Sequence, residues 1–283
     1  PLVSFFLLAR RLAWSPPVPS PPLAAQTGAF AVSMEEYSPL SYVALWAPAM
    51  AAFIVVAATR GWAGVRAYAR RLLHWKAGWG WYAAVLLGIP LLNFVAALGM
   101  EWRGADALAA PTVSAGALIV AALLRATEGP MEELGWRGFA LPMLQRRFSG
   151  FGASVVLGFL WALWHVPAFV IGRSIGGGVS GGLAYVLVVF FAVLIAQSVL
   201  MTVVYNGTGG SIPMAMLFHW MTNWPYPWET GIDLSPVAAP LWIGVALVVA
   251  LTVGRRYLSR THLHTDVTPG VPAPGSASLR TTA

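Results

Sequence analysis

Long apolar stretches, separated by short polar or charged segments, dominate this chain between residues 40 and 258. A membrane-crossing helix needs about 20 mostly apolar residues, and several of the stretches reach that length. The pattern predicts eight apolar helices, at residues 40–59, 78–99, 111–126, 130–147, 152–171, 182–205, 210–224 and 237–257. The fourth and the seventh are short or interrupted by polar residues. We therefore expect an all-α, polytopic integral membrane bundle.

The amino-acid composition supports a membrane protein and excludes several soluble classes. Hydrophobic residues make up 58% of the 283 residues, and charged residues make up only 10%. A soluble domain carries about 25% charged residues, so this chain has too few charges to cover a water-facing surface. Intrinsic disorder, a nucleic-acid-binding tail and a small secreted scaffold are excluded. The apolar stretches run unbroken instead of alternating, which argues against a transmembrane β-barrel.

The basic residues are clustered, and the clusters predict how the chain is oriented. The formal net charge is +7, but charges placed between apolar stretches are typical of orientation signals and not of nucleic-acid contacts. Segment 60–76 mixes arginines and a lysine with aromatic and aliphatic residues. It is either an amphipathic helix in the headgroup region or a solvated loop. Both interpretations place it on the cytoplasmic side.

Two further basic clusters bear on the number of crossings. They are Arg146 with Arg147, and Arg255 with Arg256 and Arg260. Both are expected to face the cytoplasm, but eight full crossings would put them outside if segment 60–76 is inside. Seven crossings, with residues 128–147 entering and returning as a re-entrant element, satisfy all three clusters. The prediction is therefore seven or eight crossings.

The two ends of the chain differ from the apolar region between them. Residues 1–39 include a Pro-rich run and are expected to form an N-terminal extension that is poorly ordered in part. Met34 is a candidate start of translation, and whether the earlier residues belong to the protein is left open. Residues 259–283 are rich in Pro, Gly, Ser and Thr, which predicts a disordered tail. The membrane domain is thus expected over residues 40–258.

The first group of candidate site residues lies in the run T-E-G-P-M-E-E-L-G-W-R-G-F, residues 127–139. Ionisable side chains inside apolar helices are costly and are functional candidates by default. Glu133 and Arg137 are four residues apart on the predicted helix, so they can pair, whereas Glu132 is rotated by about 100° and points elsewhere. Glu132 is therefore the candidate general base. The alternative, a purely structural pair at a helix start, leaves Glu132 unexplained.

Two histidines and an asparagine on later helices add to this group. His165 lies in the apolar run F-L-W-A-L-W-H-V-P, residues 159–167, and a single histidine there is more often structural than catalytic. His219 and Asn223 are four residues apart in F-H-W-M-T-N, so both polar heads project to one face of their helix. The alternative is a hydrogen-bonded pair that joins two helices.

Together, the three motifs indicate a polar cavity inside the membrane. Polar groups on three different apolar helices normally face the bundle interior. A carboxylate base, imidazoles and amide donors suit hydrolysis of an amide bond, in which the base deprotonates water and the donors stabilise the oxyanion. The chain has no H-E-x-x-H motif and no cysteine, and no cofactor is expected. A single divalent metal such as zinc, held by Glu132, His165 and His219, is the alternative.

The order of these motifs resembles one family of membrane proteins. The run E-E-L-G-W-R-G-F, a later aromatic-x-x-x-H and a final H-x-x-x-N are similar to the CAAX-protease and bacteriocin-processing family, also called CPBP or Abi. Type II CAAX prenyl endopeptidases belong to that family. The resemblance covers about residues 110–225. It implies that Glu132 is the base that activates water, assisted by His165. It also implies that His219 and Asn223 form the oxyanion site and that Glu133 and Arg137 orient the other site residues.

The resemblance implies an intramembrane endopeptidase of eight helices, with its cavity open to the cytoplasm and its location in the bacterial inner membrane. Cleavage is expected near the C-terminus of a membrane-associated peptide or protein. Trp161 stands where the family usually has Phe, an exchange that the site should tolerate. Competing interpretations are a non-catalytic protein of the same fold, with an immunity or scaffold role, and a transporter with a proton relay. All motif residues are present, which disfavours the non-catalytic protein. No internal repeat is evident, which disfavours the transporter.

Overall fold

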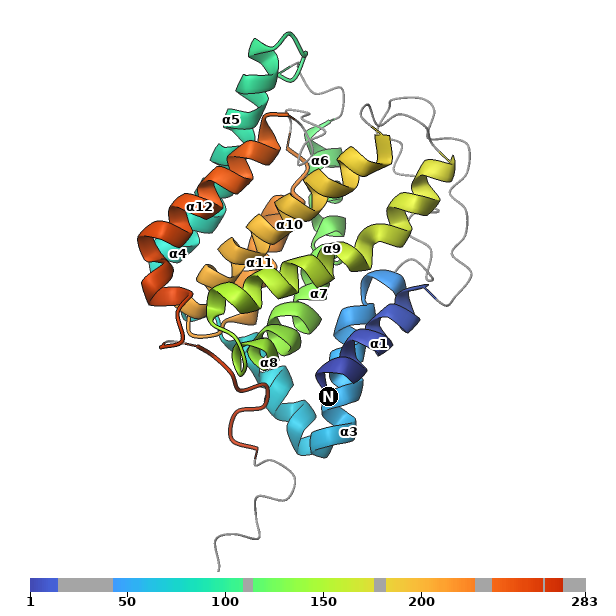
Figure 1. Ribbon diagram of the computed structural model, residues 1–283, viewed down its shortest axis with the longest axis vertical. Coiled ribbons are helices and arrows are strands. Elements are labelled where there is room, and N and C mark those ends of the chain that lie inside the picture. Colours follow the sequence, from blue (N-terminus) through green and yellow to red (C-terminus); the bar gives the residue numbers. More distant parts are fainter. Residues whose placement is uncertain (15–42, 109–113, 176–181, 227–235, 262, 272–283) are drawn as a thin grey trace, which may run out of the picture.

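The computed structural model of the protein describes residues 1–14, 43–108, 114–175, 182–226, 236–261 and 263–271. In these residues it is all-helical, and the helices pack side by side as a bundle (Figure 1). The α-helices are α1 (Leu2–Trp14), α3 (Ala47–Arg70), α4 (Trp79–Ala83), α5 (Ile89–Trp102), α6 (Ala115–Arg125), α7 (Gly129–Gly135), α8 (Leu141–Gln145), α9 (Gly150–Ile175), α10 (Gly182–Gly207), α11 (Ile212–Thr222) and α12 (Ala238–Tyr257).

Three shorter segments connect these helices and bring the structure close to the predicted pattern. The 3₁₀ segment η2 (Arg71–Leu73) continues α3. The π-helical segments η3 (Ala84–Gly88) and η4 (Trp136–Ala140) join α4 to α5 and α7 to α8. Each of the two joined stretches corresponds to one predicted apolar helix, at residues 78–99 and 130–147. The predicted all-α class is therefore confirmed.

Five helical stretches in the described residues are long and apolar enough to cross a membrane. They are Ala47–Leu73, Trp79–Trp102, Gly150–Pro167, Leu187–Gly207 and Ala238–Tyr257. Helices α6 and α11 have 11 residues each, which is shorter than a crossing requires. Large apolar side chains such as Leu91, Leu247 and Leu251 face outward, as a lipid-facing surface requires. The protein is therefore a polytopic helical membrane protein, and the expected seven or eight crossings stay a prediction.

Helix α3 has a sharp bend at Gly61 that separates its apolar part from its basic part. Gly61 has φ 59° and ψ −163°, a backbone conformation that side chains with a Cβ rarely adopt. The chain is helical again on both sides of the bend and continues to Leu73. The helical interpretation of segment 60–76 is thus favoured over the loop. Trp62 and Trp75 are exposed beside its cations, as in an interfacial helix.

Helix α7 lies at the centre of the bundle. It packs against α3 on one side and α11 on the other (Figure 1). Helix α9 packs against α10, and α10 also packs against α12. The short helix that carries the first polar motif is therefore enclosed between α3 and α11 in the interior of the bundle.

The expected N-terminal extension contains an additional helix, α1, which packs against α3. Its residues Phe5, Ala9 and Ala13 are buried, so one face of this helix is part of the core. The Phe5 ring lies 5.7 Å from the Trp136 ring, centroid to centroid, in an edge-on arrangement. Trp14 Nε1 donates to the Trp164 carbonyl oxygen at 3.1 Å. Helix α1 therefore supports the outer side of η4, while the rest of the extension lies outside the described residues.

The segment 263–271, part of the expected disordered tail, packs against one end of the bundle. Gln145 Nε2 donates to the His264 carbonyl oxygen at 3.0 Å, and Arg146 Nε donates to the Thr265 carbonyl oxygen at 2.9 Å. The acceptors in both hydrogen bonds are backbone carbonyl oxygens, which every residue has, so the amino-acid composition of the segment could not predict these contacts. Residues 272–283 of the expected tail lie outside the described residues.

All three basic clusters meet at this end of the bundle. Arg60 Nη1 donates to the Val271 carbonyl oxygen at 2.9 Å, which ties segment 60–76 to the C-terminal segment. Arg260 Nη2 donates to the Arg147 carbonyl oxygen at 3.0 Å, which joins the other two clusters. The three clusters therefore lie at the same end of the bundle, as the seven-crossing arrangement requires.

The contact between α9 and α10 depends on a glycine. A methyl group at Gly158 would lie 2.7 Å from Ile195 Cα and 3.2 Å from the Leu194 carbonyl oxygen. Backbone cannot move away as a side chain can, so we expect Gly158→Ala to lower the free energy of unfolding by about 1–3 kcal/mol. The measurement is the melting temperature in detergent. Gly244→Ala is the matched control, because no heavy atom lies within 4 Å of its Cβ position in α12, and equal melting temperatures would contradict the prediction.

Candidate active site

The first polar motif lies on the continuous helix formed by α7, η4 and α8. Pro130 fits in its first turn because a helix has no partner for the amide hydrogens there. Glu132, Glu133 and Arg137 are only 3%, 0% and 0% exposed, since α7 is enclosed between α3 and α11. Arg137 lies in the π-helical part, and such segments occur often at functional sites.

Glu133 is the centre of a buried ion-pair network. Arg137 Nη1 donates to both carboxylate oxygens of Glu133, at 2.9 Å each, so the predicted pair is confirmed. His219 Nδ1 from α11 lies 2.8 Å from Glu133 Oε1, a contact that the sequence did not reveal. Both oxygens of Glu133 are thus occupied by cationic or N–H partners, and this side chain is held in place.

Glu132 has different partners. Its Oε2 accepts hydrogen bonds from two indoles, Trp136 Nε1 at 3.0 Å and Trp161 Nε1 at 2.8 Å. Among the residues that the structure describes, no donor reaches its Oε1. The carboxylate is therefore fixed by one oxygen and has a second oxygen that can bind water. Trp136 follows Glu132 by four residues, so helical spacing could have identified it, whereas nothing in the sequence links Trp161 to Glu132.

His165 lies on α9, one turn after Trp161. Its Nδ1 is 2.9 Å from the Trp161 carbonyl oxygen. A carbonyl only accepts, so we assign the ring proton to Nδ1, which leaves a lone pair on Nε2 of the neutral ring. The side chain is half-buried and is surrounded by aromatic rings, including Trp164 at 4.8 Å between ring centroids. His165 is therefore oriented as a proton acceptor at Nε2.

His219 and Asn223 lie together at the C-terminal end of α11, against the start of α7. Asn223 is the C-cap residue of α11, and its backbone N–H donates to the His219 carbonyl oxygen at 3.1 Å. A methyl group at Gly129 would collide with both His219 Nε2 and Asn223 Nδ2. The two polar heads therefore converge, as their spacing predicted, and only glycine at position 129 leaves room for them.

Trp161 is the common neighbour of the predicted site residues. Its indole donates to Glu132, and its ring centroid lies 5.9 Å from that of His165 and 5.3 Å from that of His219. The Arg137 guanidinium carbon lies 4.7 Å from the centroid of the same ring. The structure thus brings residues from α7, η4, α9 and α11 to one place, although nearly 90 residues of chain separate the first from the last.

The predicted cavity and the metal alternative have less support. Two cavities of about 540 and 460 Å³ lie elsewhere and include none of the six predicted site residues, so a polar cavity at Glu132 stays a prediction. In the described part of the chain, no three His, Asp or Glu side chains are grouped so that they could hold a metal ion. Glu132 is bonded to two indoles and His219 to Glu133, so these donors do not fit a shared metal, and we derive no step through one.

Comparisons with known proteins match the part of the chain that contains these residues. A family model described as type II CAAX prenyl endopeptidase Rce1-like matches residues 111–225. A curated relative, CAAX prenyl protease 2 of the archaeon Methanococcus maripaludis, is 35% identical over 101 residues. That alignment covers 36% of this chain and 36% of the archaeal protein, so the chain matches about a third of its relative's length. All six predicted site residues lie inside the segment matched by the family model.

Proposed function

We propose that the chain is an intramembrane endopeptidase, because residues 111–225 match the family model of the Rce1-like type II CAAX prenyl endopeptidases, a family of proteases. The proposed reaction is hydrolysis of a peptide bond near the C-terminus of a membrane-associated peptide or protein. The name of the archaeal relative, CAAX prenyl protease 2, makes a CAAX-type prenylated peptide the first substrate to test.

The observation that carries the proposal is the difference between two adjacent glutamates. Glu133 has both oxygens engaged, by Arg137 and His219. Glu132 has one oxygen held by two indole N–H groups and the other without a protein donor among the described residues. A general base for water must be held in place and must have a free lone pair to accept the proton, and Glu132 meets both requirements.

We assign the chemical steps as follows. Glu132 Oε1 takes a proton from a water molecule, and the water oxygen attacks the scissile carbonyl carbon. His165 Nε2, which carries a lone pair, is the second acceptor that orients this water. The proton is then delivered from Glu132 to the departing amine, so the carboxylate is regenerated.

The developing oxyanion is assigned to His219 and Asn223. Asn223 Nδ2 is a neutral donor. His219 already donates through Nδ1 to Glu133, so its Nε2 donates only when the ring is an imidazolium. In that form, the positive charges of His219 and Arg137 balance the negative charges of Glu132 and Glu133, so the buried site has no net charge. An imidazolium donor at this position would stabilise the negative charge that develops on the carbonyl oxygen.

The convergence of the basic clusters supports an orientation in the membrane. We propose that the end of the bundle formed by segment 60–76, Arg146–Arg147 and the residues after α12 faces the cytoplasm, because positive loops are retained on that side. The site is proposed to open toward the same side, in a multi-pass protein of seven or eight crossings.

A comparison of membrane proteomes tests the proposed function. We expect wild-type cells to contain at least one membrane-associated peptide or protein with a shortened C-terminus, and a Glu132→Ala strain to contain the uncut form. A strain that carries Glu101→Ala is the control, because Glu101 lies at the end of α5, away from the site motifs, and is exposed. Identical C-termini in the wild-type and Glu132→Ala strains would argue against an endopeptidase.

A further inference from the structure

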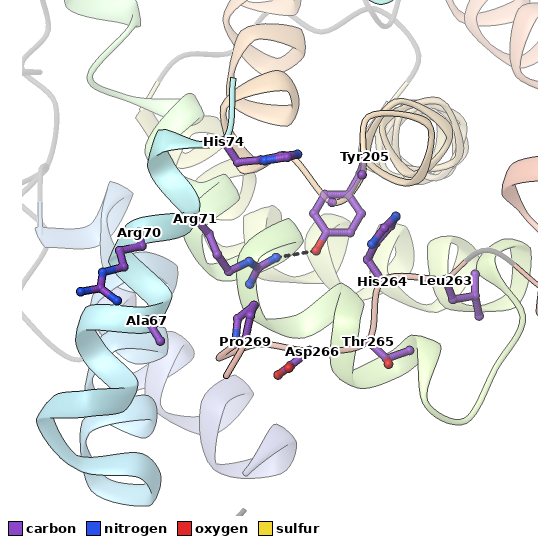
Figure 2. A pocket seen from close by; sticks show the side chains of 12 residues that line it. Ala67, Arg70, Arg71, His74, Tyr205, Leu263, His264, Thr265, Asp266 and Pro269 are labelled. Atoms are coloured by element: carbon purple, nitrogen blue, oxygen red, sulfur yellow. Dashed lines mark hydrogen bonds between the residues drawn. The ribbon is translucent and has the colours of Figure 1, made fainter. Parts of the chain in front are cut away.

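A cavity of about 540 Å³ opens at the end of the bundle where the basic clusters meet, and none of the proposed catalytic residues lines it. Its walls come from the last turns of α3 with η2, from the C-terminal end of α10 and the loop after it, and from segment 263–269 (Figure 2). The lining is polar and carries Arg70, Arg71, His74, Tyr205 and His264. The endopeptidase proposal does not use this cavity.

Arg71 provides a fixed positive charge inside the cavity. Its guanidinium points toward Tyr205 in Figure 2, and its Nη2 donates to the Tyr205 hydroxyl. Its Nη1 donates to the carbonyl oxygens of Gly138 and Val267. The group is held from several sides, and because an arginine has five N–H donors it keeps capacity for a further acceptor. The Tyr205 hydroxyl accepts from Arg71, so its own hydrogen is available to donate.

The charged residues of the lining, Arg70, Arg71 and Asp266, carry a net charge of +1. Arg70 is exposed at the rim and its side chain extends away from Arg71, while Asp266 is the one carboxylate of the lining. Asp266 Oδ1 already accepts from the Thr268 backbone N–H at 3.0 Å. Burial lowers the pKa of His264, so this imidazole is neutral near pH 7 and supplies hydrogen-bonding atoms without charge. The lining therefore presents cations and donors to an acceptor-rich anion.

Two glycines keep the floor of the cavity open. Gly209 and Gly210 have φ of 71° and 79°, in the left-handed region that favours glycine. A methyl group at Gly209 would lie 3.3 Å from His74 Nε2, and one at Gly210 would lie 3.1 Å from His264 Cβ. Side chains at these positions would enter the space between the two imidazoles.

The surroundings place the cavity at the level of lipid headgroups. Trp62, Trp75 and Trp79 are 69%, 53% and 87% exposed, and they flank the helix that carries Arg70 and Arg71. Exposed tryptophans mixed with cations mark the membrane–water interface. A basic pocket at this depth is suited to the phosphoryl part of a lipid headgroup.

We propose that this cavity binds a phosphoryl group, with Arg71 as the central cation and Tyr205 as a neutral donor. The group comes from the headgroup of an anionic phospholipid or from free phosphate, which share this chemistry. Binding at this position would fasten the C-terminal segment to η2, because both form walls of the cavity.

Native mass spectrometry and calorimetric titration of the full-length protein in detergent test this proposal. The probes are dioctanoyl phosphatidylglycerol, dioctanoylglycerol, which has the same chains and no phosphoryl group, and inorganic phosphate. We expect the phosphatidylglycerol to bind at least about tenfold more tightly than the glyceride. Arg71→Gln should weaken its binding about tenfold or more, as for loss of a charge-assisted hydrogen bond. Arg66→Gln is the matched control, because Arg66 is an exposed arginine of the same helix that does not line the cavity.

A second variant separates binding from folding, since Arg71 also holds the Gly138 carbonyl of η4. Ala67→Phe fills the cavity and removes no charge, and it should also weaken binding about tenfold, whereas Ala63→Phe, on an exposed position outside the lining, should not. Competition by inorganic phosphate at equal affinity would identify free phosphate as the source, and lipid binding without competition would identify the headgroup. Wild-type affinity in both Arg71→Gln and Ala67→Phe, or equal affinity for the glyceride, would overturn the proposal.

Discussion

Glu132→Gln should lower the rate of peptide cleavage by about 10²- to 10⁴-fold, as expected for loss of a general base. The amide oxygen of glutamine can still accept hydrogen bonds from the indoles of Trp136 and Trp161, which hold Oε2 in the wild type. The side chain keeps its place and loses only the ability to take a proton from water. The melting temperature in detergent should therefore stay within about 2 °C of the wild type.

The measurement is cleavage of the peptide identified by the proteome comparison, at saturating and at low substrate concentration. Because the base acts in the chemical step, kcat should fall and KM should change little. Glu101→Gln removes an exposed carboxylate of α5 and serves as the matched control. Cleavage by Glu132→Gln at the wild-type rate would refute the proposed mechanism.

Glu133→Gln should destabilise the protein by about 3–5 kcal/mol, the usual cost of leaving one member of a buried ion pair without its partner. Arg137 is fully buried, and its Nε and Nη2 already have no partner among the described residues. Glutamine at position 133 would leave this guanidinium without the carboxylate with which it pairs directly. We expect the melting temperature in detergent to fall by about 10 °C.

A comparison with Arg137 variants tests the electrostatic cause. Arg137→Ala should also lower the melting temperature, but by less, because Glu133 keeps His219 as a partner. In the double variant Glu133→Gln with Arg137→Met, the unpaired charge is gone, so part of the lost stability should return. An Arg137→Ala protein that is inactive and as stable as the wild type would show instead that Arg137 takes part in the chemistry.

The features that sequence predicted are those set by local spacing. Apolar runs of sufficient length identified the helices, and the four-residue spacing of Glu133 and Arg137 predicted an ion pair that the structure contains. The contact between Glu133 and His219 joins residues 86 positions apart, so no local pattern encodes it. Helix α1 was missed because its 13 residues are too few for a membrane crossing. Its apolar face is explained by α3, against which it packs, and by the Trp136 and Phe139 rings that it meets.

The sequence alone could not establish the catalytic roles or the number of crossings, because both depend on how distant segments of the chain are arranged. Glu132 and Trp161 are 29 residues apart and meet only because the fold places α9 beside the helix formed by α7 and η4. The composition of the C-terminal segment is typical of a disordered tail, yet residues 263–271 are held through their carbonyl oxygens, which every sequence has. Contacts of this kind can be identified only from the assembled structure.

The C-terminal segment also has a consequence for the order in which the protein is made. Its contacts join residues that are 211 positions apart, between Arg60 and Val271, and 196 positions apart, between Arg71 and Val267. These carbonyl partners do not exist until the ribosome has synthesised residues 267–271, so α3 enters the membrane long before Arg60 and Arg71 can reach them. Contacts of such long range form late and slowly. During biogenesis, the helices must therefore first assemble by packing in the bilayer. Residues 263–271 then bind to the end of the assembled bundle in a separate step.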